Sequence, residues 1–157
     1  MVAAVVLLVG VVAMMGMFGV AVGQNQSQGR LAVQTATYCQ NKLQQLESLK
    51  FLDSTTNTTL WPPAATGGTG LCGVMAGNAT CGSVDPASPA AGFVDYLDAN
   101  GNHVALAPGA AFEREWQVTM DATGTLKTIT VLTQALAPGA TQPPSVTMVT
   151  LKTNQGM

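Results

Sequence analysis

The sequence predicts an α+β fold, in which a long N-terminal α-helix packs on a small antiparallel β-sheet. The first half of the helix is expected to span a membrane, and its second half is expected to be amphipathic. Three observations predict this fold. The first 23 residues are apolar throughout, and a stretch without proline or internal glycine follows from Leu31 to Phe51. Beyond Gly92, short segments alternate between apolar and polar residues, which is the period of half-buried strands.

Residues 1–23 read MVAAVVLLVGVVAMMGMFGVAVG and contain no charged, amide or hydroxyl side chain. At about 1.5 Å per residue, a helix of this length crosses a hydrocarbon layer of roughly 30 Å. A cleavable signal peptide is the alternative, although no Lys or Arg precedes Arg30 to form a basic n-region. The glycines of the segment either allow close helix packing, as the GxxxG pattern of the last two indicates, or loosen the helix. They are Gly10, Gly16, Gly19 and Gly23.

Residues 24–52 are expected to continue this helix as its amphipathic half. No proline interrupts residues 1–51, so the two halves can form one helix of about 75 Å. Such a helix is longer than the domain, and its first half must be covered by lipid or by neighbouring subunits. Spacings of three and four place six residues on the face expected to lie on the sheet: Ala32, Ala36, Cys39, Leu43, Leu46 and Lys50.

Residues 53–92 are rich in Thr, Ala, Gly and Pro and predict a long ordered loop, which Trp61 is expected to anchor to the core. Cys72 and Cys81 bracket a short glycine-containing stretch, and we expect a disulfide between them. A disulfide would indicate an oxidising compartment and would leave Cys39 buried or free to pair between molecules. Three reduced, packed thiols are the alternative.

Residues 93–157 are expected to form the antiparallel sheet, in one globular domain with the second half of the helix. Asn100-Gly101 predicts a two-residue type I′ hairpin between FVDYL and HVAL. Phe112 to Met120 alternates as a strand whose buried face has one exception, Arg114, and whose outward face carries Glu113 and Glu115 as a solvated pair. LKTITVLT and SVTMVTLKT are the remaining predicted strands.

Composition and motifs exclude several classes of function. Charged residues make up 9% of the chain, with 6 Lys+Arg against 8 Asp+Glu, so nucleic acid is not an expected partner. His103 is the only histidine and has no cysteine or acid cluster at metal spacing. Asp98, Asn100 and Asn102 carry oxygens suited to calcium, but the Asn-Gly turn already accounts for them. We therefore expect no metal, no cofactor and no catalytic residue.

These segments together carry a resemblance to a known family. The opening MVAAVVLLVGVVAMMGMF resembles the N-terminal helix of type IV pilins and pseudopilins, and ATYCQNKLQQLESLKF resembles the second half of that helix. FEREWQVT, LKTITVLT and SVTMVTLKT are similar to the successive sheet strands of these subunits, in particular of the minor-pilin kind. The resemblance covers nearly the whole chain and rests on compositional patterns.

The resemblance implies a structural subunit of a type IV pilus or a type II secretion pseudopilus, which assembles through its N-terminal hydrophobic helix and does no chemistry. It implies a precursor in the bacterial inner membrane, methylated and cleaved by a prepilin peptidase. The subunit would then enter a periplasmic or cell-surface filament. The implied partners are other pilin subunits and the assembly machinery. A single-pass membrane-anchored extracytoplasmic binding domain is the alternative, and a secreted β-protein with a cleaved leader is a third reading.

Overall fold

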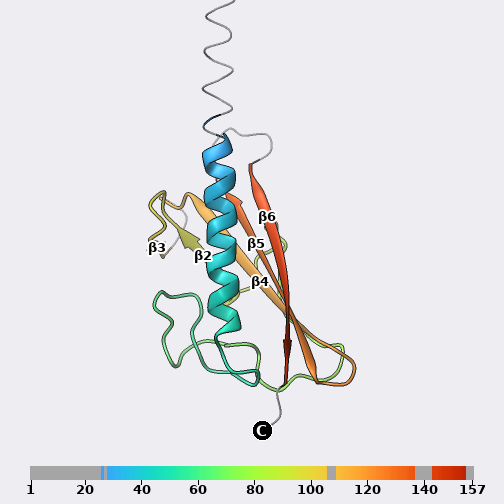
Figure 1. Cartoon of the computed structure of the whole chain (residues 1–157). Helices are drawn as coiled ribbons and strands as arrows, with labels where there is room; N and C mark the ends of the chain where they lie inside the picture. The colour runs from blue at the N-terminus through green and yellow to red at the C-terminus, as the bar shows by residue number, and fades with distance from the viewer. Residues whose placement is uncertain (1–25, 27, 106–108, 137–142, 155–157) are drawn as a thin grey trace, which may run out of the picture.

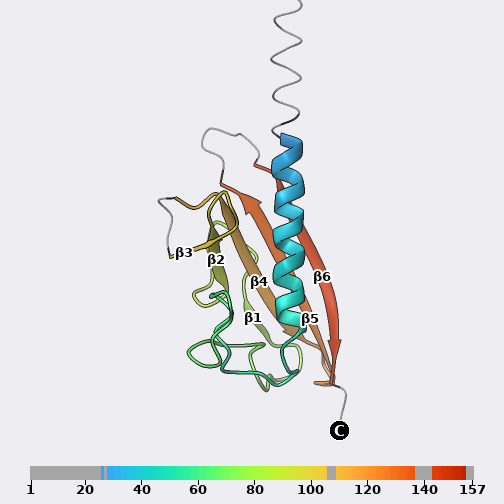
Figure 2. The same ribbon diagram turned by 60° about the vertical axis from the view of Figure 1, so that its left-hand side comes forward.

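A helix over residues 28–47 lies across one face of an antiparallel sheet in the computed structural model, which describes residue 26 and residues 28–105, 109–136 and 143–154 (Figures 1 and 2). The sheet has six strands in this part of the chain. They are β1 (Thr80–Gly82), β2 (Val94–Leu97), β3 (His103–Val104), β4 (Phe112–Met120), β5 (Leu126–Ala135) and β6 (Ser145–Thr153).

The sheet is built around β4, which is the strand with the most neighbours. Its order is β3-β2-β4-β5-β6, and the short β1 also pairs with β4. β5 pairs with β4 along its whole length, while β2 and β1 follow one another along the opposite edge of β4. All of these pairings are antiparallel. β6 is therefore the edge strand farthest from the hairpin of β2 and β3.

The core lies between the helix and the face of the sheet that carries the even-numbered residues of β4. In β4 this face carries Trp116 and Val118, and the antiparallel register adds Ile129 and Val131 from β5. Burying large apolar side chains here is worth roughly 1.5–3 kcal/mol each. The full core cluster is Cys39, Leu46, Leu71, Phe93, Trp116, Val118, Ile129 and Val131.

The predicted fold class is wrong in its helix. The sequence predicts an unbroken helix over residues 1–51, whereas the described helix ends at residue 47. Its membrane-spanning half, residues 1–23, and the glycines assigned to helix packing lie outside the described residues. Within the described ranges, no helix combines the length and the apolar character that crossing a membrane requires.

At the end of the helix, side chains donate hydrogen bonds to its last carbonyl groups. The positions of proline and glycine, from which the end of the helix is predicted, do not reveal these bonds. The hydroxyl of Ser48 donates to the carbonyl of Gln45 (2.7 Å), and Nζ of Lys152 in β6 donates to the carbonyl of Glu47 (2.5 Å). The final carbonyls of any helix lack intrahelical partners, and a cation there also interacts favourably with the helix dipole. The edge strand thus caps the helix.

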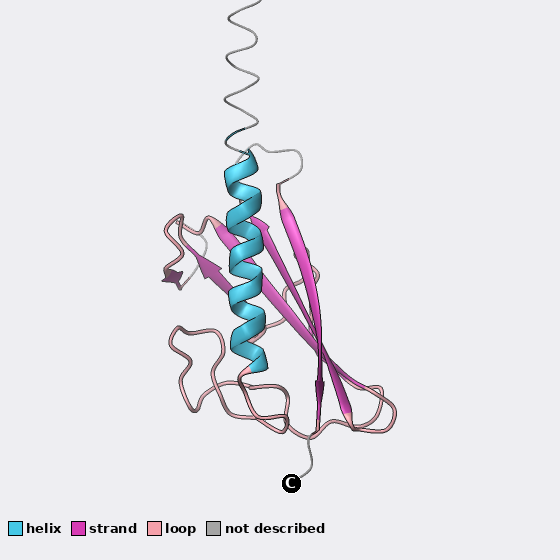
Figure 3. Cartoon of the chain, in the orientation of Figure 1, coloured by secondary structure: helices cyan, strands magenta, loops and turns pink. Residues whose placement is uncertain are grey.

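The loops of residues 48–79 gather beside the C-terminal end of the helix (Figure 3). Lys127 holds them to the sheet, because its buried Nζ donates to the carbonyls of Phe51 (2.6 Å), Leu71 (2.8 Å) and Gly73 (2.7 Å). The predicted disulfide between Cys72 and Cys81 is present and fastens the same region to β1. Residues 53–92, predicted as a long ordered loop, also contain one short strand of the sheet, β1.

The predicted hairpin is present, but its turn is not of the predicted type. Residues 98–102 connect β2 to β3, so the connection is longer than a two-residue type I′ turn. The Asp98 carboxylate organises it by accepting the backbone N–H groups of Asn100 (2.8 Å) and Asn102 (2.9 Å). An Asp side chain that shapes a turn in this way has both carboxylate oxygens occupied, since Nδ2 of Asn102 donates to the second one (3.0 Å).

Candidate functional site

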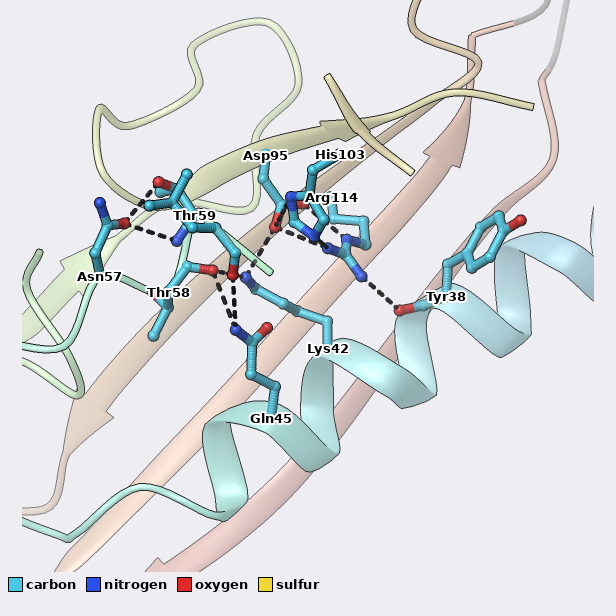
Figure 4. Close-up of polar contacts among 10 residues, drawn as sticks. Tyr38, Lys42, Gln45, Asn57, Thr58, Thr59, Asp95, His103 and Arg114 are labelled. Carbon is cyan, nitrogen blue, oxygen red and sulfur yellow. Dashed lines mark hydrogen bonds and ion pairs between the residues drawn. The ribbon is translucent and has the colours of Figure 1, made fainter. Parts of the chain in front are cut away.

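The most unusual feature of the described chain is a cluster of charged side chains buried between the helix and the sheet (Figure 4). Asp95 in β2 and Arg114 in β4 are directly opposite each other in the antiparallel register, so their side chains share the helix-facing side. Lys42 reaches the same point from the helix. We call Lys42, Asp95, Arg114 and His103 the charged cluster.

Asp95 is the centre of the charged cluster. Arg114 binds it through two parallel bonds, Nε to Oδ1 at 2.7 Å and Nη2 to Oδ2 at 2.8 Å. Nζ of Lys42 lies 2.9 Å from the same Oδ2. Burial alone would raise the pKa of Asp95, but the positive charges of Lys42 and Arg114 outweigh it and hold that pKa below its usual range. Asp95 is therefore ionised and fully occupied at neutral pH.

Lys42 is completely buried. Lysine is almost never fully buried unless it is paired, and Lys42 has several partners. Besides Asp95, its Nζ donates to the carbonyl of Thr58 and lies 3.7 Å from the centre of the Trp116 ring, a cation–π contact. Burial lowers the pKa of Lys42 to about 8, against the opposing effect of Asp95 and with a smaller contribution from Arg114. The ammonium therefore stays charged at neutral pH.

His103 completes the charged cluster as a neutral side chain. Nη2 of Arg114 lies 3.1 Å from Nε2 of His103, and since Arg is always protonated, Nε2 must accept this bond. Burial lowers the pKa of His103, and the cations Arg114 and Lys42 lower it further against the charge of Asp95. The sequence shows no cysteine or acid cluster at metal spacing from His103, and its partner Arg114 is brought to it only by the pairing of β2 with β3 and with β4.

The charged cluster has the features of a structural ion-pair cluster that holds elements of the fold together. Its carboxylate accepts three bonds from two cations and is almost completely buried, so it is held by these partners and not presented to solvent. What the arrangement does is fix three elements relative to one another: the helix through Lys42, β2 through Asp95 and β4 through Arg114. Among the described residues, no three His, Cys, Asp or Glu side chains converge on a point that could hold a metal ion.

A second buried acid lies on the opposite face of the sheet. Glu115 was predicted to form a solvated pair with Glu113, but 1% of its surface is exposed and both carboxylate oxygens lack a hydrogen-bond partner. Glu113 differs, because Nε2 of Gln134 donates to it (3.0 Å). Burial raises the pKa of Glu115 to about 7, and the charges of Glu113 and Asp85 add to this effect.

A groove of about 570 Å³ opens beside the charged cluster. The helix forms one wall, the hairpin of β2 and β3 forms another, and the chain around Trp61 forms the third. Trp61 was predicted to anchor its loop to the core, yet 66% of its surface is exposed. Its indole lines the groove instead, within reach of solvent.

The predicted helix stripe is only partly the face that meets the sheet. Cys39 and Leu46 are buried and Leu43 packs against the core, whereas Ala32 is exposed and Ala36 half-buried. The face of the helix that meets the sheet is rotated relative to the predicted stripe. It includes two completely buried polar residues that the stripe omitted, Thr35 and Lys42. Cys39 is a buried free thiol.

The sequence contained a signal for the charged cluster that apolar patterns alone did not use. Asp95 has the same parity as Leu97 in its strand, just as Arg114 has the parity of Trp116, so both charges fall on apolar faces. An acid and a base on the buried faces of two neighbouring strands indicate a buried ion pair. Lys42, three residues after Cys39, completes the pattern.

Comparisons of the chain with family models, with curated proteins and with solved structures found no match.

Proposed function

We propose that this chain is a structural subunit of a type IV pilus or of a type II secretion pseudopilus, which performs no catalysis and joins other subunits through its apolar residues 1–23. The observation that carries the proposal is the attachment of helix 28–47 to the sheet by buried charges, Lys42 to Asp95 and Asp95 to Arg114. In the sequence, only residues 24–27 separate this helix from the apolar segment.

This attachment suits a subunit that bears load. A force applied at the apolar segment reaches the helix first and must then pass to the sheet. Apolar contacts resist separation without direction, whereas the bidentate bonds of Arg114 to Asp95 and the bond of Lys42 fix one geometry. The capping of the helix end by Lys152 of β6 adds a second fixed point.

The apolar segment and the disulfide support the proposed location and partners. A run of 23 residues without a polar side chain does not remain in water, so it needs lipid or other copies of itself around it. The disulfide between Cys72 and Cys81 supports a compartment outside the cytoplasm. The proposed sequence of events is delivery at the inner membrane, processing by a prepilin peptidase, and assembly with other subunits into a periplasmic or surface filament.

The test is to ask whether this chain is present in filaments and enters them through its apolar segment. Sheared surface material from cells producing the full chain is examined by electron microscopy and by mass spectrometry. We expect the chain in the filament fraction, and we expect Val11→Lys to remove it, because a charge inside an apolar packing surface is costly to bury.

Val74→Lys is the matched control, since Val74 is 85% exposed on a loop of the globular part. This variant should enter filaments like the wild type. The proposal is overturned if the wild-type chain is absent from sheared filaments while it is abundant in cells, or if Val11→Lys enters them as well as Val74→Lys does.

An extracytoplasmic binding domain is a second candidate, favoured by the groove that Trp61 lines. The two functions make different demands on the chain. A binding domain needs the groove and does not need copies of itself, so its activity would survive Val11→Lys, while filament entry would not.

A further inference from the structure

The groove beside the charged cluster combines one exposed aromatic ring with neutral polar side chains. Trp61 is 66% exposed, the largest side chain left so open among the described residues. An indole presents a wide apolar face. Leaving it in water forgoes the favourable free energy that burying this face would provide. Because the ring lines a concave surface, its exposed face is available to a ligand.

The chain just before Trp61 is tied to the helix, so the backbone that carries the indole has a defined position. Nζ of Lys42 donates to the carbonyl of Thr58. Nε2 of Gln45 lies 3.4 Å from the same carbonyl and 3.3 Å from the carbonyl of Leu60. The charged cluster therefore also positions one wall of the groove. A wall fixed in advance lowers the entropy that binding would otherwise lose.

The opposite wall is a polar stripe of the helix. Asn41, Gln44 and Ser48 recur at spacings of three and four, are exposed, and line the groove. The two amide side chains can donate and accept hydrogen bonds, as the hydroxyl groups of a ligand do, and the Ser48 hydroxyl, which already donates to the carbonyl of Gln45, can still accept one. None of the three carries a charge.

The charged groups at the base of the groove are already bonded to one another. Two cations share the single carboxylate of Asp95, so the charged cluster carries one net positive charge, but Lys42 is completely buried and the guanidinium of Arg114 bonds to Asp95, His103 and the carbonyl of Tyr38. His103, which also lines the groove, accepts a bond from Arg114 and is neutral. An anionic ligand would therefore find no free cation here, and a cationic one no free carboxylate.

We propose that this groove binds a neutral saccharide, whose apolar ring face stacks on Trp61 and whose hydroxyl groups bond to Asn41, Gln44 and Ser48. A sugar ring is the ligand that presents both features at once: C–H groups on a flat face and hydroxyl groups around the rim. The inference goes beyond filament assembly and does not depend on it, because the groove lies within one copy of the chain.

Binding is tested on the full chain in a detergent without a sugar headgroup, since a maltoside would compete for the groove. Maltotriose, cellotriose, galactotriose and chitotriose are titrated in turn. The chain has 2 tryptophans, and Trp116 is completely buried, so a change in emission on titration reports on Trp61. We expect at least one trisaccharide to shift the emission to shorter wavelength and to give saturation-transfer signals in NMR.

Variants separate the groove from the rest of the chain. Trp61→Ala should abolish the saturation transfer, and Gln44→Ala should weaken binding by about tenfold, the effect of losing one good hydrogen bond. Val74→Ala, at an exposed position outside the groove, should leave binding unchanged. The proposal is overturned if no trisaccharide binds, if Trp61→Ala binds as the wild type does, or if a sialylated trisaccharide binds more tightly than its neutral counterpart.

Discussion

Asp95 is the side chain that joins the helix to two strands of the sheet, through its ion pairs with Lys42 and Arg114. Two cations depend on it, and both are almost completely buried. Removing one partner from such a group leaves a buried charge unpaired, which costs far more than the pair contributes. The same logic explains why Lys42 and Arg114 are tolerated on faces that otherwise hold apolar residues.

Asp95→Asn should lower the free energy of unfolding by about 3–5 kcal/mol, because the amide cannot balance the charges of Lys42 and Arg114. Urea denaturation of the full chain in detergent measures this loss. Asp85→Asn is the matched control, since Asp85 is exposed and the new side chain can still accept the N–H of Ala87. Surface ion pairs contribute up to about 1 kcal/mol, so a loss below this value for Asp95→Asn would contradict the assignment of a buried structural ion-pair cluster.

Glu115 gives the chain a pH dependence of known sign. Its folded pKa of about 7 lies above the ordinary value of 4.5. Between these two pH values the folded state therefore holds a proton that the unfolded state has lost. The stabilisation is full below about pH 4.5 and is lost as the pH rises through 7. Its neighbours explain the shift, because Val94 and Leu132 flank it on the adjacent strands while Glu113 and Asp85 supply negative charge.

Glu115→Gln should therefore remove this pH dependence. The variant should match the wild type near pH 4.5 and exceed its stability above pH 7 by about 2 kcal/mol, less than the full shift converts to. Thermal denaturation across this pH range provides the measurement. The exposed Glu47→Gln should keep the wild-type profile, and a Glu115→Gln profile parallel to wild type would refute a buried neutral Glu115.

At the scale of elements, the sequence predicts the long strands well and the ends of elements poorly. β4 follows from an alternation with the single exception of Arg114, and β5 and β6 follow from runs rich in Val, Ile, Leu and Thr, which are local properties of each strand. The end of the helix at residue 47 depends on Lys152, and the burial of Glu115 depends on the chain covering that face of β4. Such contacts join residues far apart in the sequence, so local patterns do not contain them.

The same division applies to the candidate site. The parity of Arg114 within its strand marks it as an exception, and this was visible in the sequence. Its partner became identifiable only when the pairing of β2 with β4 placed Asp95 opposite. The exposure of Trp61 had no local signal at all, because a tryptophan in a loop is equally compatible with anchoring and with binding.

The disulfide should stabilise the element that it closes. Cys72 and Cys81 are 9 residues apart, and closing a loop of this length in the unfolded chain is worth about 2–3 kcal/mol. The double variant Cys72→Ala/Cys81→Ala should lose this amount in urea denaturation. Cys39→Ala controls for the removal of a buried thiol outside the disulfide. If reduction of the wild type leaves its unfolding midpoint unchanged, the loop is held by Lys127 alone.

At the scale of the whole molecule, the charged cluster connects two properties that are usually separate, stability and the shape of a binding surface. Replacing a complete buried ion cluster with apolar side chains of similar size is often neutral or stabilising, unlike removal of one member. The bond from Lys42 to the carbonyl of Thr58 would still be lost in such a replacement. Stability and groove shape should therefore respond differently to it.

The triple variant Lys42→Met/Asp95→Leu/Arg114→Met tests this separation. We expect its free energy of unfolding to lie within about 2 kcal/mol of the wild type, well above that of Asp95→Asn alone. Its binding of the neutral trisaccharide should nevertheless weaken, because the chain before Trp61 loses its bond to Lys42 and keeps those to Gln45. Urea denaturation and saturation-transfer NMR on the same sample measure both quantities. A stable variant that binds as the wild type does would show that the charged cluster fixes the helix to the sheet without shaping the groove.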